Sequence, residues 1–199
     1  MANFNKMYSE DKKAWRDDVS SILISALSYV KGGRVLDLGC AQGKESLFLC
    51  DKGFNVVAVD SSSVAIEQLK TKVKKDKLEN IEAIESDVVD FKIEKDKYDL
   101  IICFNVLYFL KRAQALKVIK DIQDGLRMDG IVAMSLFTVQ DPFYNKEKKE
   151  RFYVETDQIK RLFSKFEILD YFDGTISDSG HASLPEPHSH GVVKLIAKK

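Results

Sequence analysis

The sequence predicts an α/β protein with a seven-stranded, mostly parallel sheet, helices on both faces of the sheet and an antiparallel hairpin at one edge. Short apolar, β-branched runs alternate with helix-like segments through most of the chain, which is the pattern of a parallel sheet. The last two predicted strands have no helix between them, so they would pair as an edge hairpin. With 199 residues, the chain is expected to form a single domain.

One long amphipathic helix is predicted over residues 9–31. Apolar side chains recur at helical spacing from Trp15 to Val30, so they would share one stripe that faces the core. Gly32 and Gly33 would end this helix, because glycine is common just beyond a helix C-terminus.

Seven short segments have the β-branched and apolar composition of buried strands. They cover residues 34–38, 55–59, 81–84, 98–104, 130–137, 166–171 and 192–197. Helices are predicted between most of them, at residues 45–51, 64–75, 115–126 and 157–163. Gly53 would end the first of these helices, and the serines at 61–63 would cap the start of the second. The resulting order is β–α–β–α–β–β–α–β–α–β–β.

The composition argues against several classes of partner. Thirty-one Lys and Arg residues balance thirty-one Asp and Glu residues, whereas a protein that grips a nucleic-acid backbone usually carries a basic excess. No apolar stretch approaches the ~20 residues of a membrane helix, and the N-terminus has no apolar signal core. Three cysteines without metal-ligand spacing suit free thiols in a reducing compartment. We therefore expect a cytoplasmic protein without a nucleic-acid or membrane partner, and the sequence leaves the oligomeric state open.

The residues that follow the predicted strands should carry the ligand site, because open α/β sheets bind ligands at the carboxyl ends of their strands. The loop after the first strand reads Asp37-Leu38-Gly39-Cys40-Ala41-Gln42-Gly43. Its glycines allow a tight turn and a close approach of backbone to ligand. Asp60 ends the second strand 21 residues after Gly39, where an acid can accept hydrogen bonds from ribose hydroxyls. This spacing favours nucleoside binding; the alternative is a simple turn in which Asp60 caps the next helix.

A dinucleotide cofactor fits this loop poorly. The Gly-x-Gly-x-x-Gly fingerprint would require glycines at two positions where the chain has Ala41 and Lys44. An oxidoreductase with a nicotinamide cofactor is therefore disfavoured.

From Asp37 to Gly43 the chain resembles the first motif of class I S-adenosylmethionine-dependent methyltransferases. In that family an acid is commonly followed by three alternate glycines, and Ala41 departs from the middle one by a single methyl group. Within the superfamily, residues 36–47 and the short His-containing edge hairpin that ends in Leu195–Lys199 resemble the tellurite-resistance-type methyltransferases.

This resemblance covers the chain from about residue 33 to its end. It implies one methyltransferase domain over residues 1–199, with a Rossmann-like core at 32–199 and a helical N-terminal lid at 1–31. S-adenosylmethionine would be the cofactor and S-adenosylhomocysteine the product.

The resemblance also assigns roles to the first loop and to the end of the second strand. Residues 39–43 would wrap the methionine part of the cofactor, with Cys40 as a small packing residue. Asp37 would approach the amino group, directly or through water. Asp60 would accept hydrogen bonds from the ribose hydroxyls, and Ser61 would flank the adenine.

Two further strand ends receive roles in the same way. After the third strand, Asp87 would accept a hydrogen bond from the adenine amino group, and the Val88 backbone would lie beside the ring. After the fourth strand, Phe104 and Asn105 would lie near the methionine end and the methyl group.

Methyl transfer from a sulfonium is an in-line displacement, so the protein mainly has to orient the acceptor. His188 and His190 would share one face of the last strand and could serve as base or clamp for the acceptor; an exposed polar loop is the alternative. Tyr108, just past the fourth strand, is a further acceptor-pocket candidate. No metal site is expected from the histidines, because no nearby carboxylate completes one. The segment Asp141–Tyr144 resembles a motif of amino-group methyltransferases but follows the wrong strand, and we interpret it as a turn.

The leading prediction is a methyltransferase that acts on a small molecule. A protein or RNA acceptor stays open, because a short lid can suffice for a docked partner. A non-catalytic cofactor-binding or scaffolding protein also stays open, since nothing in the sequence establishes turnover.

Overall fold

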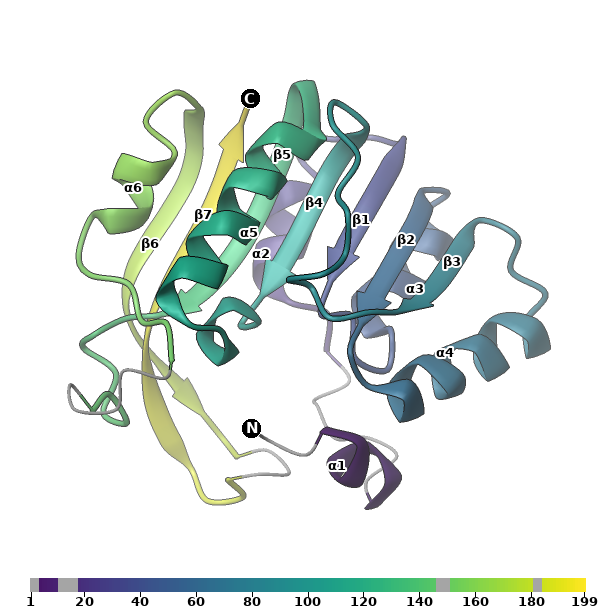
Figure 1. Cartoon of the computed structure of the whole chain (residues 1–199), viewed down its shortest axis with the longest axis horizontal. Coiled ribbons are helices and arrows are strands. Elements are labelled where there is room, and N and C mark those ends of the chain that lie inside the picture. The colour runs from purple at the N-terminus through teal and green to yellow at the C-terminus, as the bar shows by residue number, and fades with distance from the viewer. Residues whose placement is uncertain (1–3, 11–17, 146–150, 181–183) are drawn as a thin grey trace.

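A seven-stranded mixed sheet forms the centre of the molecule (Figure 1). In the computed structural model, which describes residues 4–10, 18–145, 151–180 and 184–199, the strand order is β3-β2-β1-β4-β5-β7-β6. The strands are β1 (Arg34–Leu38), β2 (Asn55–Asp60), β3 (Ile81–Glu85), β4 (Tyr98–Phe104), β5 (Leu126–Phe137), β6 (Glu167–Asp178) and β7 (His188–Lys198). Strands β1 to β5 are parallel, and β7 lies antiparallel to both β5 and β6. The predicted parallel sheet with an antiparallel edge pair is confirmed.

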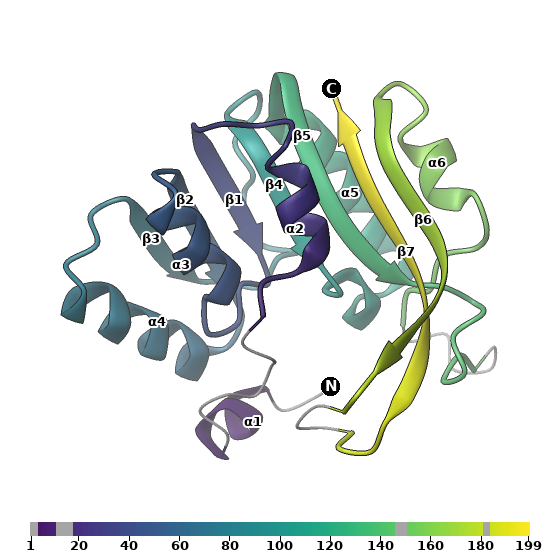
Figure 2. The ribbon, with the colours of Figure 1, turned by 180° about the vertical axis from the view of Figure 1, so that it is seen from behind.

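Helices cover both faces of the sheet (Figures 1 and 2). They are α1 (Phe4–Glu10), α2 (Ser21–Ala26), α3 (Lys44–Asp51), α4 (Ser63–Lys75), α5 (Arg112–Gly125) and α6 (Gln158–Leu162), with a short 3-10 helix, η1 (Leu107–Phe109). The apolar sides of α5 and α6 join one buried cluster, and those of α2, α3 and α4 join a second. β4 contributes to both clusters and is buried from Tyr98 to Cys103, as expected of a strand covered on both faces. None of the helices in the described ranges is long and apolar enough to cross a membrane.

The N-terminal segment does not form the single helix predicted over residues 9–31. α1 and α2 are separate helices, and residues 18–20, just before α2, are not helical. The side chains of Lys44 and Glu45, at the start of α3, hydrogen-bond to the backbone of residues 18–20 at 2.7 and 3.4 Å. The helical repeat is interrupted because this backbone pairs with α3 instead. Trp15 lies outside the described residues.

The hairpin of β6 and β7 is longer than predicted and reaches past the rest of the sheet (Figures 1 and 2). From Val192 onward, β7 pairs with both β5 and β6, whereas residues 188–191 pair with β6 alone. Since β5 ends at Phe137, opposite Val192, this two-stranded extension begins at the carboxyl end of the parallel strands. The extension therefore stands beside the edge of the sheet where the ligand site is predicted.

Candidate functional site

The loop after β1 turns sharply at two glycines. Gly39 has φ +76°, and a Cβ atom there would overlap the Val106 side chain. Gly43 has φ +83°, and a Cβ atom there would overlap Leu69 of α4. Both positions favour glycine, because L side chains rarely adopt this backbone conformation. The backbone of the loop is thus packed directly against the elements that follow β2 and β4.

Asp60, at the end of β2, ties this loop to the start of α4. One carboxylate oxygen accepts the Ala41 N–H and the other accepts the Ser62 N–H, both at 2.8 Å. The carboxylate therefore supports the start of the helix, and each oxygen keeps a second lone pair for a ligand hydroxyl. Burial raises the pKa of Asp60, and the backbone donors oppose the shift. Ser61, the next residue, is exposed.

Asp37 is a buried carboxyl group near the end of β1. Its Oδ2 accepts the Ser46 hydroxyl at 2.6 Å, and no salt bridge to Asp37 is found among the residues that the structure describes. Burial raises the pKa of Asp37 to about 8, with the Ser46 hydrogen bond opposing the shift. A cation brought by a ligand would stabilise the charged form of such a group.

The ends of β3 and β4 complete this edge of the sheet. Asn105 follows β4 in a left-handed conformation with φ +58°, and its Oδ1 accepts the Ser135 hydroxyl at 2.9 Å. The side chain of Asn105 is thereby turned toward β5, and Phe104 before it is half-buried. After β3, the exposed Asp87 carboxylate accepts a backbone N–H two residues on at 2.9 Å, and Val88 is buried.

All the residues predicted to bind the cofactor thus lie at the carboxyl ends of the four strands β1 to β4. An adenosyl ligand with a charged amino group fits the groups present there. They include a buried carboxyl group that forms no salt bridge with the described residues, a second carboxylate with lone pairs left for a ligand, and a loop whose glycines let the backbone approach a ligand. The individual contacts with a cofactor stay a prediction.

α1 packs beside the start of α4, next to the carboxyl ends of the parallel strands (Figure 1). The Gln68 amide donates to the Tyr8 carbonyl at 3.0 Å, and Tyr8 packs in an apolar cluster with Ala41 of the loop. At the other end of α1, Phe4 packs edge-on against Phe109 of η1 with 5.0 Å between ring centroids. α1 therefore spans from α4 to η1, where a lid is expected, and its function as a lid stays a prediction.

Tyr108, in η1, is the centre of an aromatic cluster next to this edge. Its ring packs edge-on against Phe137 and Tyr153, with centroid distances of 5.0 and 5.1 Å. The Arg151 guanidinium lies over the Tyr108 ring, 4.5 Å from its centroid, and donates a hydrogen bond to its hydroxyl. Burial raises the pKa of Tyr153. The cluster combines apolar ring surface with hydroxyl and guanidinium groups.

His188 and His190 lie side by side on the hairpin extension. Their Nε2 atoms are 3.0 Å apart, and the His190 ring lies 4.7 Å from the Phe137 ring between centroids. Because Phe137 also contacts Tyr108, the three predicted acceptor-pocket residues belong to one continuous group of side chains. The alternative of an exposed polar loop does not hold, because both histidines belong to β7 and only 12% of the His190 side chain is exposed.

The expectation that no carboxylate lies near the histidines is wrong. Asp141 Oδ2 is 2.8 Å from His190 Nδ1, and Asp178 lies directly opposite His188 in the hairpin. Asp141 is buried, and Phe143, from the same turn, packs against both histidine rings. The segment 141–144 forms the predicted turn, in which the Tyr144 N–H donates to the Asp141 carbonyl at 2.9 Å. It follows the carboxyl end of β5, which places it beside the histidines at the mouth of the predicted pocket.

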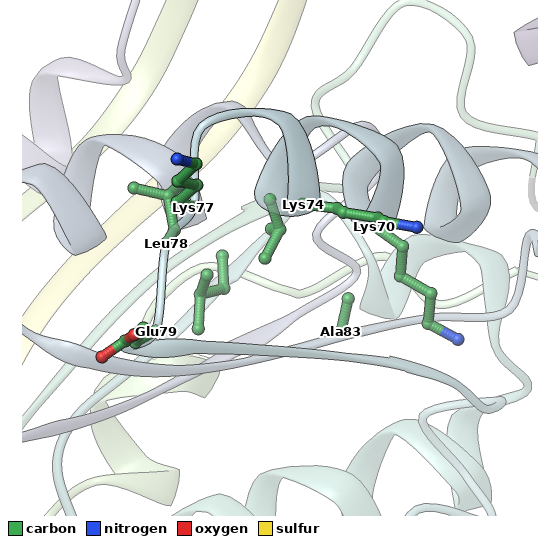
Figure 3. Close-up of a pocket in the computed structure, with 8 residues that line it drawn as sticks. Lys70, Lys74, Lys77, Leu78, Glu79 and Ala83 are labelled. Atoms are coloured by element: carbon green, nitrogen blue, oxygen red, sulfur yellow. The ribbon is translucent and has the colours of Figure 1, made fainter.

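A separate cavity of about 420 Å³ lies away from this edge, between α4 and β3 (Figure 3). Lys70 and Lys74 of α4 line it together with the apolar Leu78 and Ala83. None of the predicted site residues contributes to its walls. We therefore place the candidate site at the carboxyl ends of the strands and not in this cavity.

Comparison with known proteins identifies the family. A family model described as "Tellurite resistance protein TehB" matches residues 3–178. The chain belongs to this family. A relative from Haemophilus influenzae strain 10810, named "Probable S-adenosyl-L-methionine-dependent methyltransferase TehB", is 29% identical over 153 residues, which are 75% of this chain and 51% of the relative. "Hemagglutinin 1" of Eikenella corrodens is 26% identical over 192 residues, which are 94% of this chain and 62% of that protein.

Solved structures share the fold of this TehB-family chain. The crystal structure of TehB from Haemophilus influenzae has a TM-score of 0.81 at 22% identity and covers 98% of this chain and 67% of that one. A methyltransferase from Methanosarcina mazei has a TM-score of 0.69 at 18% identity, over 92% and 98% of the two chains. The chain spans between half and two thirds of the length of the curated relatives named above. The resemblance to tellurite-resistance-type, class I methyltransferases is confirmed.

Proposed function

We propose that this TehB-family chain is an S-adenosylmethionine-dependent methyltransferase that acts on a small molecule. The observation that supports this proposal is the pair of buried carboxyl groups, Asp37 and Asp60, on either side of the glycine loop after β1. When bound, the cofactor supplies a methyl group already activated on a sulfonium. The residues of the chain then have to hold the cofactor, orient the acceptor and keep water out.

Each cofactor residue has a group suited to one part of the ligand. An ionised Asp37 would accept a hydrogen bond from the amino group, whose charge would offset the cost of a buried carboxylate. The unused lone pairs of Asp60 would accept the ribose hydroxyls, while two backbone N–H groups hold the carboxylate in place. Asp87 and the Val88 backbone would contact the adenine, with the exposed Ser61 beside it.

The acceptor would lie between the cofactor and the aromatic cluster. Phe104 and Asn105 would face the methionine end, and the ring of Tyr108 would form a wall of the acceptor pocket. His188 and His190 would contact the acceptor from the hairpin side. Closing the site with α1 would exclude water and hold the acceptor in line with the methyl group, which is where most of the rate gain of such a displacement arises.

Calorimetric titration with S-adenosylmethionine, S-adenosylhomocysteine and NAD tests the proposal. We expect micromolar binding of both adenosyl ligands, no binding of NAD, and loss of adenosyl binding in Asp60→Ala. Asp90→Ala, which removes an exposed carboxylate after β3, is the matched control and should bind normally. A folded wild-type protein that binds neither adenosyl ligand would overturn the proposal.

The competing hypotheses are a protein or RNA acceptor and a non-catalytic role. The balanced net charge and the small aromatic cluster favour a small molecule. Formation of S-adenosylhomocysteine with small thiols, amines or phenols would support the proposal. Formation only with protein or RNA fractions would support the first alternative. Cofactor binding without product in every fraction would support the second.

Three free, buried cysteines favour a reducing compartment, and we propose the cytoplasm.

A further inference from the structure

The two histidines of the hairpin extension have an unusual mutual geometry. His190 Nδ1 lies 2.8 Å from the Asp141 carboxylate, and His188 Nδ1 lies 2.7 Å from the Glu186 carbonyl. Both of these oxygen atoms can only accept hydrogen bonds, so both Nδ1 atoms carry the ring proton. With the Nδ1 atoms turned to these acceptors, the two Nε2 atoms face each other 3.0 Å apart. Either a proton shared by the two nitrogens or a metal ion bound by both accounts for such a contact.

A carboxylate completes the group. Asp178 lies directly opposite His188 in the hairpin, and one ligand atom each from Asp178, His188 and His190 lie within 4.8 Å of one another. One oxygen of Asp178 accepts the Gly180 N–H at 2.8 Å, which fixes the orientation of the carboxylate. All three side chains are half-buried, and each is held by a second hydrogen-bonding partner. Metal ligands in proteins are oriented in this way.

We propose that Asp178, His188 and His190 bind a divalent transition-metal ion of the Zn²⁺ class. Two imidazole nitrogens about 2.0–2.1 Å from a tetrahedral zinc are about 3.3 Å apart, which is close to the spacing of the Nε2 atoms. Two imidazoles and one carboxylate suit zinc and its neighbours in the first transition row, whereas Ca²⁺ and Mg²⁺ prefer oxygen ligands. Three protein ligands leave a fourth position for water or for an anionic group.

Asp141 is a positioning residue in this arrangement. It contacts His190 through Nδ1, on the opposite side of the ring from the metal-facing Nε2. A carboxylate in this place fixes the tautomer of a ligating histidine and raises its basicity. Phe143 packs against both rings.

The proposed metal site lies next to the proposed acceptor pocket. Phe137 contacts His190 on one side and Tyr108 on the other, so the three ligands border the acceptor side of the site. A role in holding an acceptor thiol or hydroxyl rests on the proposed function, whereas binding of the metal does not. Metal binding and adenosyl binding are therefore tested separately.

The test is titration of the metal-free 199-residue chain with Zn²⁺ in competition with a chromogenic chelator. We expect one tight site per chain that is lost in Asp178→Asn and in His188→Ala. Asp170→Asn, which removes an exposed carboxylate on the same strand β6, is the matched control and should keep the site. Asp141→Asn should weaken binding by about 10–100-fold without abolishing it.

Two further measurements determine the ligand set of the metal and whether each variant is folded. Co²⁺ in place of Zn²⁺ should give the visible absorption of a four-coordinate ion with nitrogen and oxygen ligands, and His190→Ala should abolish it. Circular dichroism and thermal unfolding show whether each variant is folded. If folded wild-type protein binds no Zn²⁺, the histidines share a proton and not a metal, and the proposal is wrong. It is equally wrong if Asp178→Asn and His188→Ala both keep the wild-type affinity.

Discussion

The Asp60 carboxylate accepts the Ala41 N–H at 2.8 Å, which joins the end of β2 to the middle of the loop after β1. Ala41 stands where the methyltransferase motif commonly has its second glycine, and its φ is +50°. An L side chain in this left-handed region costs roughly 1–2 kcal/mol. The hydrogen bond that Ala41 N–H donates to Asp60 offsets part of this cost, so a residue at the end of β2 stabilises the left-handed alanine.

Ala41→Gly should raise the free energy of unfolding by up to about 1 kcal/mol, because glycine relieves the left-handed strain at some cost in unfolded-state entropy. Urea unfolding measures this change. Ala58→Gly, in the buried interior of β2, is the matched control and should lower the stability. A loss of stability in Ala41→Gly would show that Ala41 is not strained.

Gly39→Ala should destabilise the protein more than Gly53→Ala does. The two glycines have similar φ values, +76° and +85°, so both variants introduce a backbone cost of roughly 1–2 kcal/mol. A Cβ at Gly53 meets no atom within 4 Å, whereas one at Gly39 overlaps Val106. The difference between the losses of unfolding free energy in the two variants therefore measures the cost of the overlap with Val106. Equal losses would mean that Val106 moves aside without cost.

The stability of the ligand-free protein should fall as pH rises, because of Asp37. Its pKa is raised by burial from 3.8 to about 8, so in this range the folded state binds more protons than the unfolded state. The stabilisation from Asp37 is complete below pH ~4 and is lost as pH rises through about 8. Asp37→Asn should flatten this part of the profile, as measured by unfolding at pH 5 to 9. Parallel profiles would contradict the raised pKa.

Binding of S-adenosylmethionine near pH 7 should release a proton from Asp37. The ligand-free carboxyl group is mostly protonated below its pKa of about 8, and the cofactor's amino group would stabilise the ionised form. Calorimetry in buffers of different ionisation enthalpy measures the release, which should vanish well above pH 8 and in Asp37→Asn. Proton-neutral binding at pH 7 would mean that the amino group lies elsewhere.

Phe4→Ala should speed dissociation of S-adenosylmethionine several-fold if α1 closes the site. The variant removes the ring contact with Phe109 that joins α1 to η1. Stopped-flow competition with S-adenosylhomocysteine measures the dissociation rate. Ile24→Ala, an exposed change on α2, is the control and should leave this rate unchanged. An unchanged rate in Phe4→Ala would remove the evidence for a lid.

Local patterns in the sequence were enough to predict much of this protein. The alternation of apolar strands and amphipathic helices predicted the sheet and its edge hairpin. The spacing of the apolar residues in each element shows which face of that element is buried. The glycines at 39 and 43 and the acid at Asp60 located the first loop, since only a few residue types permit that turn. These signals depend on residues close together in the chain.

The remaining features depended on contacts between distant segments. The predicted helix over residues 9–31 is interrupted where its backbone meets side chains at the start of α3, and no local pattern encodes that meeting. The carboxylates of Asp141 and Asp178 join His188 and His190 only because β5, β6 and β7 converge at one edge. The sequence by itself determined the fold class and the candidate cofactor loop. Only the tertiary structure decided which polar groups meet beyond β5, because hydrogen bonds between distant side chains form only where the folded sheet brings those side chains together.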